Sequence, residues 1–301
     1  MVNFFDEMRR NKVITVFLVA FFFCVALLFG VIAGFFIGNI YVGLAIAAVI
    51  AVIYTLVVYY KGSNMILSLS NAHEVTKQNY PYLINTVEGL SIAAGLKKVP
   101  KLYIINDPSM NAFATGNSPE KSVIVLTKGL VDKMNRQEIE GVISHEMSHI
   151  KNNDIKIMIL ATVLAGVIII IADIVLRMLF WGGGGFGRGR DNDNNALFFI
   201  LLILGLVALI LAPFISTVIK MTISRKREFL ADANGAELTR YPEGLASALE
   251  KIRDENVVNT KLNKSFASLY FAMPKKQENW FVKMLSSHPP INERIKRLRA
   301  M

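Results

Sequence analysis

Cysteine and histidine are scarce in this sequence: its 301 residues include one cysteine, Cys24, and four histidines. A single cysteine excludes an intramolecular disulfide framework and a thiolate cluster around a metal ion. The 33 Lys and Arg residues exceed the 23 Asp and Glu residues, which gives a formal charge of +10. These cations carry no base-stacking aromatic motif, so we expect no nucleic-acid partner. Attraction to the anionic headgroups of a lipid bilayer explains the excess more simply.

Long apolar runs, in contrast, are abundant, and 53% of the residues are hydrophobic, above the roughly 45–50% of soluble domains. Residues 13–38 and 40–60 carry no charge, and each is long enough for a helix that crosses a bilayer, which takes about 20 residues. They predict a transmembrane hairpin at 13–60. Gly30, Gly34 and Gly38 recur every four residues, a spacing that lets helices approach closely in lipid. We expect these glycines to pack against the second helix of the same chain.

Two further runs, 157–180 and 196–219, predict a second transmembrane hairpin. The segment between them, 181–195, is rich in Gly and Asn and predicts a loop. Inside the third run, Asp173 and Arg177 are four residues apart and can pair on one helical face. Four spans in all would place both chain ends on the same side of the membrane.

The polar segments 61–155 and 221–301, on either side of the second hairpin (156–220), hold most of the Lys and Arg residues. Cations near transmembrane spans are retained in the cytoplasm. We therefore expect both segments and both termini on the cytoplasmic side of the inner or plasma membrane. Together the segments are large enough for one compact domain but small for two.

Secondary structure in the first polar segment is expected to begin with a helical stretch at 64–95. Three β-branched runs separated by turn residues then predict a small β-sheet. These runs are residues 101–107, 111–116 and 121–129. Asn135, with Glu138 three residues later, predicts a capping box that begins a helix extending through His149.

The sequence HEMSH at 145–149 places two histidines four residues apart on that helix. Residues at this spacing share one face, so His145 and His149 can direct imidazole nitrogens at one metal ion. Catalytic zinc sites usually combine three imidazole or carboxylate ligands with a water molecule, and we expect one Zn²⁺ per chain. Glu146 lies beside the first ligand and can act as general base toward water activated by the ion.

The third metal ligand must lie on the same side of the membrane as the two histidines. Residues 224–238 follow the fourth apolar run and are polar and helix-prone. Two crossings separate His149 from Glu228, and an even number returns the chain to the same face, so Glu228 is the leading candidate. Asp232, one helical turn later, could accept a hydrogen bond from a ligating histidine and fix its tautomer.

Structural roles for these residues are open alternatives at this point. The two histidines could be a structural pair, Glu228 a surface charge among neighbouring cations, and Asp232 a salt-bridge partner. His73 is also followed by glutamate, but Lys77 stands where a second histidine would be needed. We therefore interpret His73 as a residue on a helix surface.

Four segments together resemble the HtpX-type membrane zinc metalloproteases, relatives of the CAAX prenyl proteases. In chain order they are NAFATG (111–116), HEMSHIKNND (145–154), SRKREFLAD (224–232) and SSHPPINERIKRL (286–298). The resemblance covers nearly the whole chain. It implies a multi-pass α-helical membrane protein whose cytoplasmic catalytic domain is zincin-like, mostly α within an α+β fold, and carries a small β-sheet.

The resemblance also implies roles for individual residues. It makes the three metal-binding candidates zinc ligands and Glu146 the catalytic base. His288 matches the family's His-Pro motif and would contact the substrate or the developing oxyanion. Asn111 and its strand match the family's substrate-binding edge strand, although from the sequence alone Asn111 could equally be a turn residue. Ser148 occupies a position that is usually Gly in the family.

The function implied by the resemblance is cleavage of misfolded or damaged membrane proteins at the cytoplasmic membrane surface. One alternative is a CAAX-type prenyl-protein protease, a branch that typically has more spans. Another is a nonenzymatic membrane scaffold or a transporter, which the intact Glu146 and the few paired charges in the spans disfavour. An intramembrane protease is disfavoured because Lys151 and Asp154 would lie in hydrocarbon at high cost.

Overall fold

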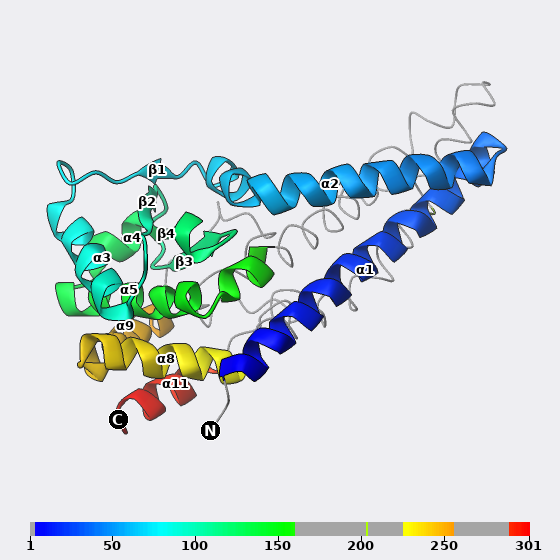
Figure 1. Cartoon of the computed structure of the whole chain (residues 1–301). Coiled ribbons are helices and arrows are strands. Elements are labelled where there is room, and N and C mark those ends of the chain that lie inside the picture. The colour runs from blue at the N-terminus through cyan, green and yellow to red at the C-terminus, as the bar shows by residue number, and fades with distance from the viewer. Residues whose placement is uncertain (1–3, 160–202, 204–224, 256–288) are drawn as a thin grey trace.

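The computed structural model describes residues 4–159, 203, 225–255 and 289–301. A helical hairpin opens the chain: α1 (Phe4–Ile37) and α2 (Ile40–Leu69) pack along each other from the turn at Gly38 and Asn39. They diverge toward the rest of the molecule (Figure 1). The side chain of Asn39 begins α2 by accepting hydrogen bonds from the first backbone N–H groups of that helix.

Glycines allow the close approach of the two hairpin helices. A methyl group at Gly30 would lie 2.9 Å from the carbonyl oxygen of Gly43, and one at Gly34 would lie 2.8 Å from Cα of Ile40. These positions pack within the chain as expected from the four-residue spacing. Gly38 was expected to belong to the same packing face, and that was wrong. It forms the turn with a φ of +82°, where a side chain would contact nothing within 4 Å.

The second helix, α2, has two parts with different surroundings. Among the described residues it is the one helix long and apolar enough to cross a membrane, with a mean hydropathy of 2.5 over its most apolar window. Large exposed hydrophobic side chains follow it from Ile40 to Tyr60. Beyond Tyr60, buried Ile66 and Leu67 pack against the β-sheet. The expected spans at 157–180 and 196–219 fall almost wholly outside the described residues, so the multi-pass topology stays a prediction.

The four-stranded sheet has the order β1-β2-β4-β3, in which β2 and β4 are parallel and the other pairs antiparallel. The strand bounds are β1 His73–Glu74, β2 Lys101–Ile105, β3 Ala112–Gly116 and β4 Ser122–Thr127. The three expected strand runs are confirmed. In the described structure, β3 is an edge strand, and β4 is its one strand neighbour.

The expected helical stretch over 64–95 is confirmed at 64–69 and 81–94 and is wrong for the residues between them. The chain leaves α2 at Leu69, turns at Asn71 with a φ of +49°, and enters β1. Helix α3 (Pro81–Ala94) begins only at a proline, which favours the first helical turn because its missing N–H would have no partner there. His73 is therefore an exposed residue of the edge strand β1, and not of a helix.

Helices cover the face of the sheet that is opposite α2. The capping box of Asn135 and Glu138 is confirmed, and it begins α5 (Arg136–Lys151). Strand β3 and helices α3, α8 (Arg225–Thr239) and α9 (Pro242–Arg253) all contact α5. Other described helical segments are the short α4 (Lys128–Lys133), a 3₁₀ turn at Pro119–Lys121, residues 154–159 after the end of α5, and α11 (Ile291–Leu298).

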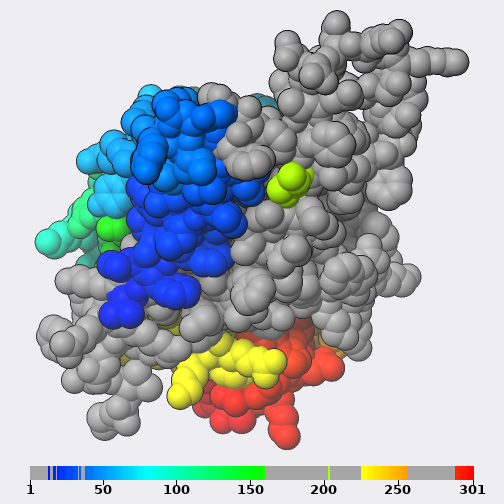
Figure 2. Space-filling view, turned by 90° about the vertical axis from the view of Figure 1, so that its right-hand side faces the viewer, coloured from blue at the N-terminus to red at the C-terminus, as the bar shows by residue number. Residues whose placement is uncertain are grey.

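The last helix, α11, packs on α8 and α9, and Figure 2 shows α8 and α11 side by side at the surface. A shared apolar core joins α3, the sheet, α5, α9 and α11. The described parts of the two polar segments therefore pack as one layered unit, with α5 at its centre.

Candidate metal centre

His145 and His149 lie on the buried central helix α5, with 0% and 3% of their surface exposed. Their Nε2 atoms are 3.2 Å apart, and the rings meet nearly edge to face, at 83°. The helical spacing thus brings two imidazole nitrogens to one point, as expected for residues one turn apart.

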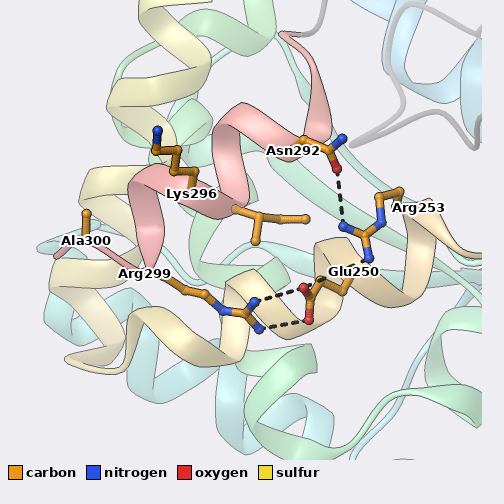
Figure 3. A pocket seen from close by; sticks show the side chains of 7 residues that line it. Glu250, Arg253, Asn292, Lys296, Arg299 and Ala300 are labelled. Atoms are coloured by element: carbon orange, nitrogen blue, oxygen red, sulfur yellow. Dashed lines mark hydrogen bonds and ion pairs between the residues drawn. The ribbon is translucent and has the colours of Figure 1, made fainter.

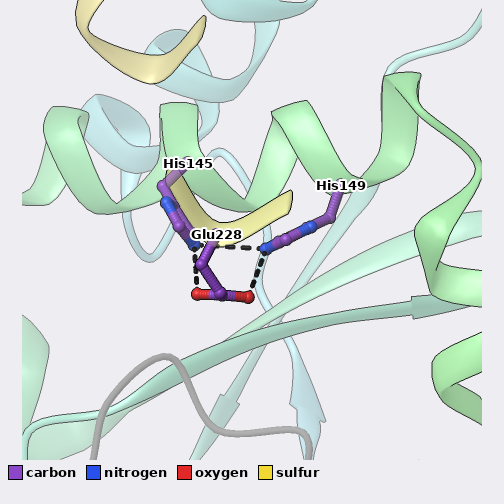
Figure 4. A group of neighbouring side chains, drawn as sticks. All are labelled: His145, His149 and Glu228. Atoms are coloured by element: carbon purple, nitrogen blue, oxygen red, sulfur yellow. Dashed lines mark hydrogen bonds and ion pairs between the residues drawn. The ribbon is translucent and has the colours of Figure 1, made fainter. Parts of the chain in front are cut away.

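Glu228 is delivered to that point by α8, which crosses α5 (Figure 4). Its Oε1 lies 3.5 Å from Nε2 of His149, and its Oε2 lies 3.7 Å from Nε2 of His145. Both separations exceed an ordinary hydrogen bond. One ligand atom from each of the three buried residues lies within 4.8 Å of the others. The structure therefore brings together all three residues that were expected to bind metal.

Each histidine ring is oriented by a carboxylate on its far side. Nδ1 of His145 lies 3.0 Å from Oδ1 of Asp232, and Nδ1 of His149 lies 3.1 Å from Oδ2 of Asp154. A ring that donates Nδ1–H to a carboxylate has its Nε2 lone pair free to bind a metal. Asp232 was expected in this role, whereas Asp154 was missed. Asp154 reaches the ring because Asn153, with a φ of +58°, turns the chain just after α5 ends.

Two buried arginines accompany the carboxylates, and sequence reasoning missed both roles. Arg294 on α11 donates Nε–H to Oδ2 of Asp232 at 2.9 Å and Nη2–H to Oδ1 at 2.7 Å. Arg227, next to Glu228 on α8, has its Nε 3.5 Å from Oδ1 of Asp154. The sequence did offer one indication that Arg294 belongs to the site. It lies six residues after His288, inside a segment that carried the family resemblance.

Ionisation in the cluster reflects burial and these charges. Burial, with Arg294 nearby, lowers the pKa of His145 to about 4 against the opposing effect of Asp232. Burial acts to lower the pKa of His149 too, but the Asp154 hydrogen bond and the surrounding carboxylates raise it to about 9. Burial acts to raise the pKa of Asp232, and Arg294 and His145 together bring it below its ordinary value.

The donor set fits a divalent cation. Ligand atoms held about 2.1 Å from a tetrahedral ion lie about 3.4 Å from one another, close to the 3.2, 3.5 and 3.7 Å separations of this cluster. Six charged side chains are buried around it: Glu146, Asp154, Glu228, Asp232, Arg227 and Arg294. Four carboxylates against two guanidinium groups leave two negative charges, which a divalent ion balances. Buried charges are stable only when they are compensated in this way.

The remaining expected site residues have different surroundings. Glu146 is buried on α5 beside His145, and its charge contributes to the raised pKa of His149. Asn111 is buried just before β3, where its Oδ1 accepts the backbone N–H of Ala112 at 2.9 Å. This contact suits a residue that begins the strand, and a substrate role for Asn111 stays a prediction. His288 lies outside the described residues.

Comparisons with known proteins agree with this geometry. Residues 77–301 match the model of peptidase family M48. The chain is 46% identical over 305 aligned residues to a protein named protease HtpX homolog from Dictyoglomus turgidum, covering 99% of this chain and 95% of the relative. Proteins of the same name from Listeria monocytogenes (44%) and Streptococcus pyogenes (43%) each match over 99% of both chains.

Among solved structures, the crystal structure of S. mikatae Ste24p has the same fold, with a TM-score of 0.50 and 18% identity. The match covers 99% of this chain and 66% of that one. The described helices and the small mixed sheet thus belong to the fold of a solved protein. With a family match over most of its length and relatives above 40% identity, the chain belongs to peptidase family M48 and is an HtpX-type metallopeptidase.

Proposed function

We propose that this protein is a zinc-dependent endopeptidase that cleaves misfolded or damaged membrane proteins at the cytoplasmic surface of the membrane. The observation that carries the proposal is the buried cluster of His145, His149 and Glu228, whose ligand atoms converge from α5 and α8. Two imidazoles and one carboxylate form a ligand set of catalytic zinc sites, whereas Mg²⁺ and Ca²⁺ prefer oxygen ligands throughout. The donor chemistry therefore favours Zn²⁺.

The catalytic steps assigned to the chain's own residues follow from their positions. A zinc ion held by the three ligands supplies Lewis-acid polarisation of the scissile carbonyl and activation of water. Glu146, one residue from His145 and buried, accepts a proton from the attacking water and then delivers it to the leaving amine. For His288, which lies outside the described residues, the family resemblance alone supports a role in holding the developing oxyanion.

The edge strand β3 is the place where we propose that an extended substrate binds. Strand β3 contacts α5, the helix that carries the histidines, and in the described structure its other edge has no strand neighbour. A peptide can add to such an edge through backbone hydrogen bonds. Pairing with β4 holds β3 extended from Ala112 to Gly116, as addition of a peptide strand requires.

Proximity to the membrane is supported by the packing of α2. The run of exposed apolar side chains on this helix extends from Ile40 to Tyr60, and in the following turns Ile66 and Leu67 are buried against the sheet. Phe113, on the proposed substrate strand β3, belongs to this contact. One rigid helix thus connects the apolar segment with the back of the proposed substrate strand. This arrangement suits substrates that are presented from the bilayer.

The proposal is tested with the full chain reconstituted in lipid vesicles. Wild-type protein should contain about one zinc per chain and cleave an unfolded membrane-protein substrate, whereas Glu146→Gln should keep the zinc and the fold and lose cleavage. Retained turnover in Glu146→Gln would remove the general-base assignment. A prenylated peptide in the same assay tests the alternative substrate class, and preferential cleavage of that peptide would overturn the proposed one.

A further inference from the structure

Arg294 is a fully buried cation at the edge of the metal cluster. Its exposed fraction is 0%, and it is among the largest fully buried side chains of the described residues. It reaches the cluster from α11, 145 residues after His149 in the chain and close to its C-terminus. Burial of a guanidinium group is costly unless several partners compensate it, so the contacts of Arg294 indicate what it does.

Most of those contacts are with one carboxylate, and Nη2 also lies 3.3 Å from Nδ1 of His145, farther than from Asp232. Two guanidinium nitrogens bind the two oxygens of Asp232 at 2.7 and 2.9 Å. The Oδ1 atom of Asp232 that receives the shorter of these bonds also lies 3.0 Å from Nδ1 of His145. Nη1 of Arg294 is farther, 3.7 Å, from Oε2 of Glu228. The planar fork of arginine fixes the direction of a bound carboxylate, so Arg294 fixes the direction in which Asp232 faces His145.

We infer that Arg294 is a positioning residue for metal binding, which acts through Asp232 to hold the tautomer of His145 whose Nε2 binds the ion. The inference rests on the metal site of the proposed function. Without the fork, Asp232 can rotate away from His145, and the ring loses the acceptor that keeps the proton on Nδ1. The C-terminal helix α11 thereby completes a site whose ligands lie on α5 and α8.

A purely electrostatic role would have the opposite consequence. A guanidinium group repels a divalent cation, so removal of a simple buried positive charge should tighten metal binding. Removal of a positioning residue should weaken it, and loss of such outer partners typically costs about 10–100-fold in metal affinity. The direction of the change in affinity therefore separates the two roles.

The experiment measures the Zn²⁺ dissociation constant of the detergent-solubilised full chain by competition with a chromophoric chelator. Arg294→Gln and Arg294→Lys should both raise the dissociation constant by about 10-fold or more, because lysine keeps the charge but lacks the fork. If Arg294→Gln fails to fold, the dissociation constant of Arg294→Lys alone decides the outcome. The double variant Asp232→Asn/Arg294→Gln should bind Zn²⁺ no more weakly than Asp232→Asn alone. If Arg294 acts through Asp232, the effects of the two substitutions on zinc affinity are not additive.

Arg299, the residue that follows the last residue of α11, provides a matched control. It binds Glu243 on α9 and is 43% exposed, and Figure 3 shows its ion pair with Glu250 of the same helix. Arg299→Gln weakens the docking of α11 without touching Asp232, so its zinc affinity should stay within about twofold of the wild type. A comparable loss in this variant would mean that helix docking alone accounts for the effect.

Other outcomes separate this inference from the proposed function. Unchanged or tighter zinc binding in folded Arg294→Gln and Arg294→Lys would overturn the positioning role. Failure of the wild-type chain to bind zinc would instead overturn the metal site itself. The visible absorption of the Co²⁺-loaded protein gives an independent readout. Rotation of the His145 ring should change the absorption spectrum of the bound Co²⁺, whereas a loss of stability that leaves the ligands in place should not.

Discussion

Gly235 on α8 lies directly against the backbone of His145 on α5. A methyl group at position 235 would lie 3.2 Å from the backbone nitrogen of His145 and 3.1 Å from Oγ of Ser144. At the same helix crossing, Asn234 donates a hydrogen bond to Oγ of Ser148 at 3.0 Å. The serine that departs from the family's usual glycine thus helps to join the two ligand-bearing helices.

We predict that Gly235→Ala weakens metal binding and lowers stability, because the added methyl pushes α8, and with it Glu228, away from the histidines. Overpacking of this kind typically costs about 1–3 kcal/mol and outweighs the gain of about 0.5–1 kcal/mol from replacing a helical glycine. Zinc affinity and the thermal midpoint of the full chain are the measurements.

The control is Gly89→Ala on α3, where a methyl group would meet nothing within 4 Å. The same substitution there should stabilise the protein by about 0.5–1 kcal/mol and leave zinc affinity unchanged. If the two variants behaved alike, the close contact between α8 and α5 would not control the site.

Removal of the metal should destabilise the protein, because the buried cluster loses the divalent ion that balances its excess of carboxylates. A ligand that binds only the folded state stabilises it by about 2.7 kcal/mol at 100 times its dissociation constant. We therefore expect chelation to lower the thermal midpoint and added Zn²⁺ to restore it. Glu146→Gln should retain this response, since Glu146 is not a ligand, and Glu228→Ala should lose it. A full response in Glu228→Ala would mean that the third ligand is another residue.

The metal-binding trio could be predicted from the sequence because each step used a local or topological rule. Helical spacing put His145 and His149 on one face, and the even number of expected crossings put Glu228 on their side of the membrane. Asp154 escaped prediction because it contacts His149 only after Asn153 adopts a left-handed conformation. Arg294 escaped because no periodicity links the last helix to a carboxylate 62 residues earlier.

The strands and the capping box were predictable for a similar reason, since turn residues and capping residues act on their immediate neighbours. The break after α2 was not predicted, because the apolar and polar pattern of residues 64–95 is compatible with a helix. Tertiary packing decides there: β1 pairs with β2, with His73 opposite Ile104 and Glu74 opposite Tyr103. Such a pairing is visible only once the sheet exists.

Glu138 gives a prediction for the dependence of stability on pH. Its buried carboxylate accepts hydrogen bonds from Lys251, Ser247 and the backbone of Asn135. Burial acts to raise the pKa of Glu138, but these three bonds lower it below its ordinary value of 4.5. The stabilisation is thus fully present above pH 4.5 and is lost as the pH falls through the lower folded-state pKa.

Glu138→Gln should therefore lower the stability by about 1–3 kcal/mol at neutral pH, and the difference from wild type should shrink in acid. Glutamine can keep the capping-box hydrogen bond, so the variant isolates the effect of the charge. Thermal midpoints measured across an acidic pH series give the comparison, with Glu140→Gln on the same helix as control. A difference that did not depend on pH would contradict the ionic role of Glu138.

Glu255 fixes the loop that leads into the proposed substrate strand. Its carboxylate accepts the backbone N–H of Met110 at 2.9 and 3.0 Å and binds Lys133 at 2.9 Å, with 2% of its side chain exposed. Glu255→Ala leaves a buried N–H without this acceptor, which costs about 1–3 kcal/mol. Because the loop sets the start of β3, we expect KM for peptide substrates to rise severalfold, with a smaller change in kcat.

The opposite edge of the sheet supplies the control for that prediction. Glu74 on β1 pairs with Lys101 and is 45% exposed, so Glu74→Ala should change neither kinetic constant. Steady-state kinetics with an unfolded substrate, at a temperature where all variants remain folded, separate KM from kcat. A lower stability with an unchanged KM in Glu255→Ala would show that the loop supports the fold alone, and it would remove β3 as the substrate strand.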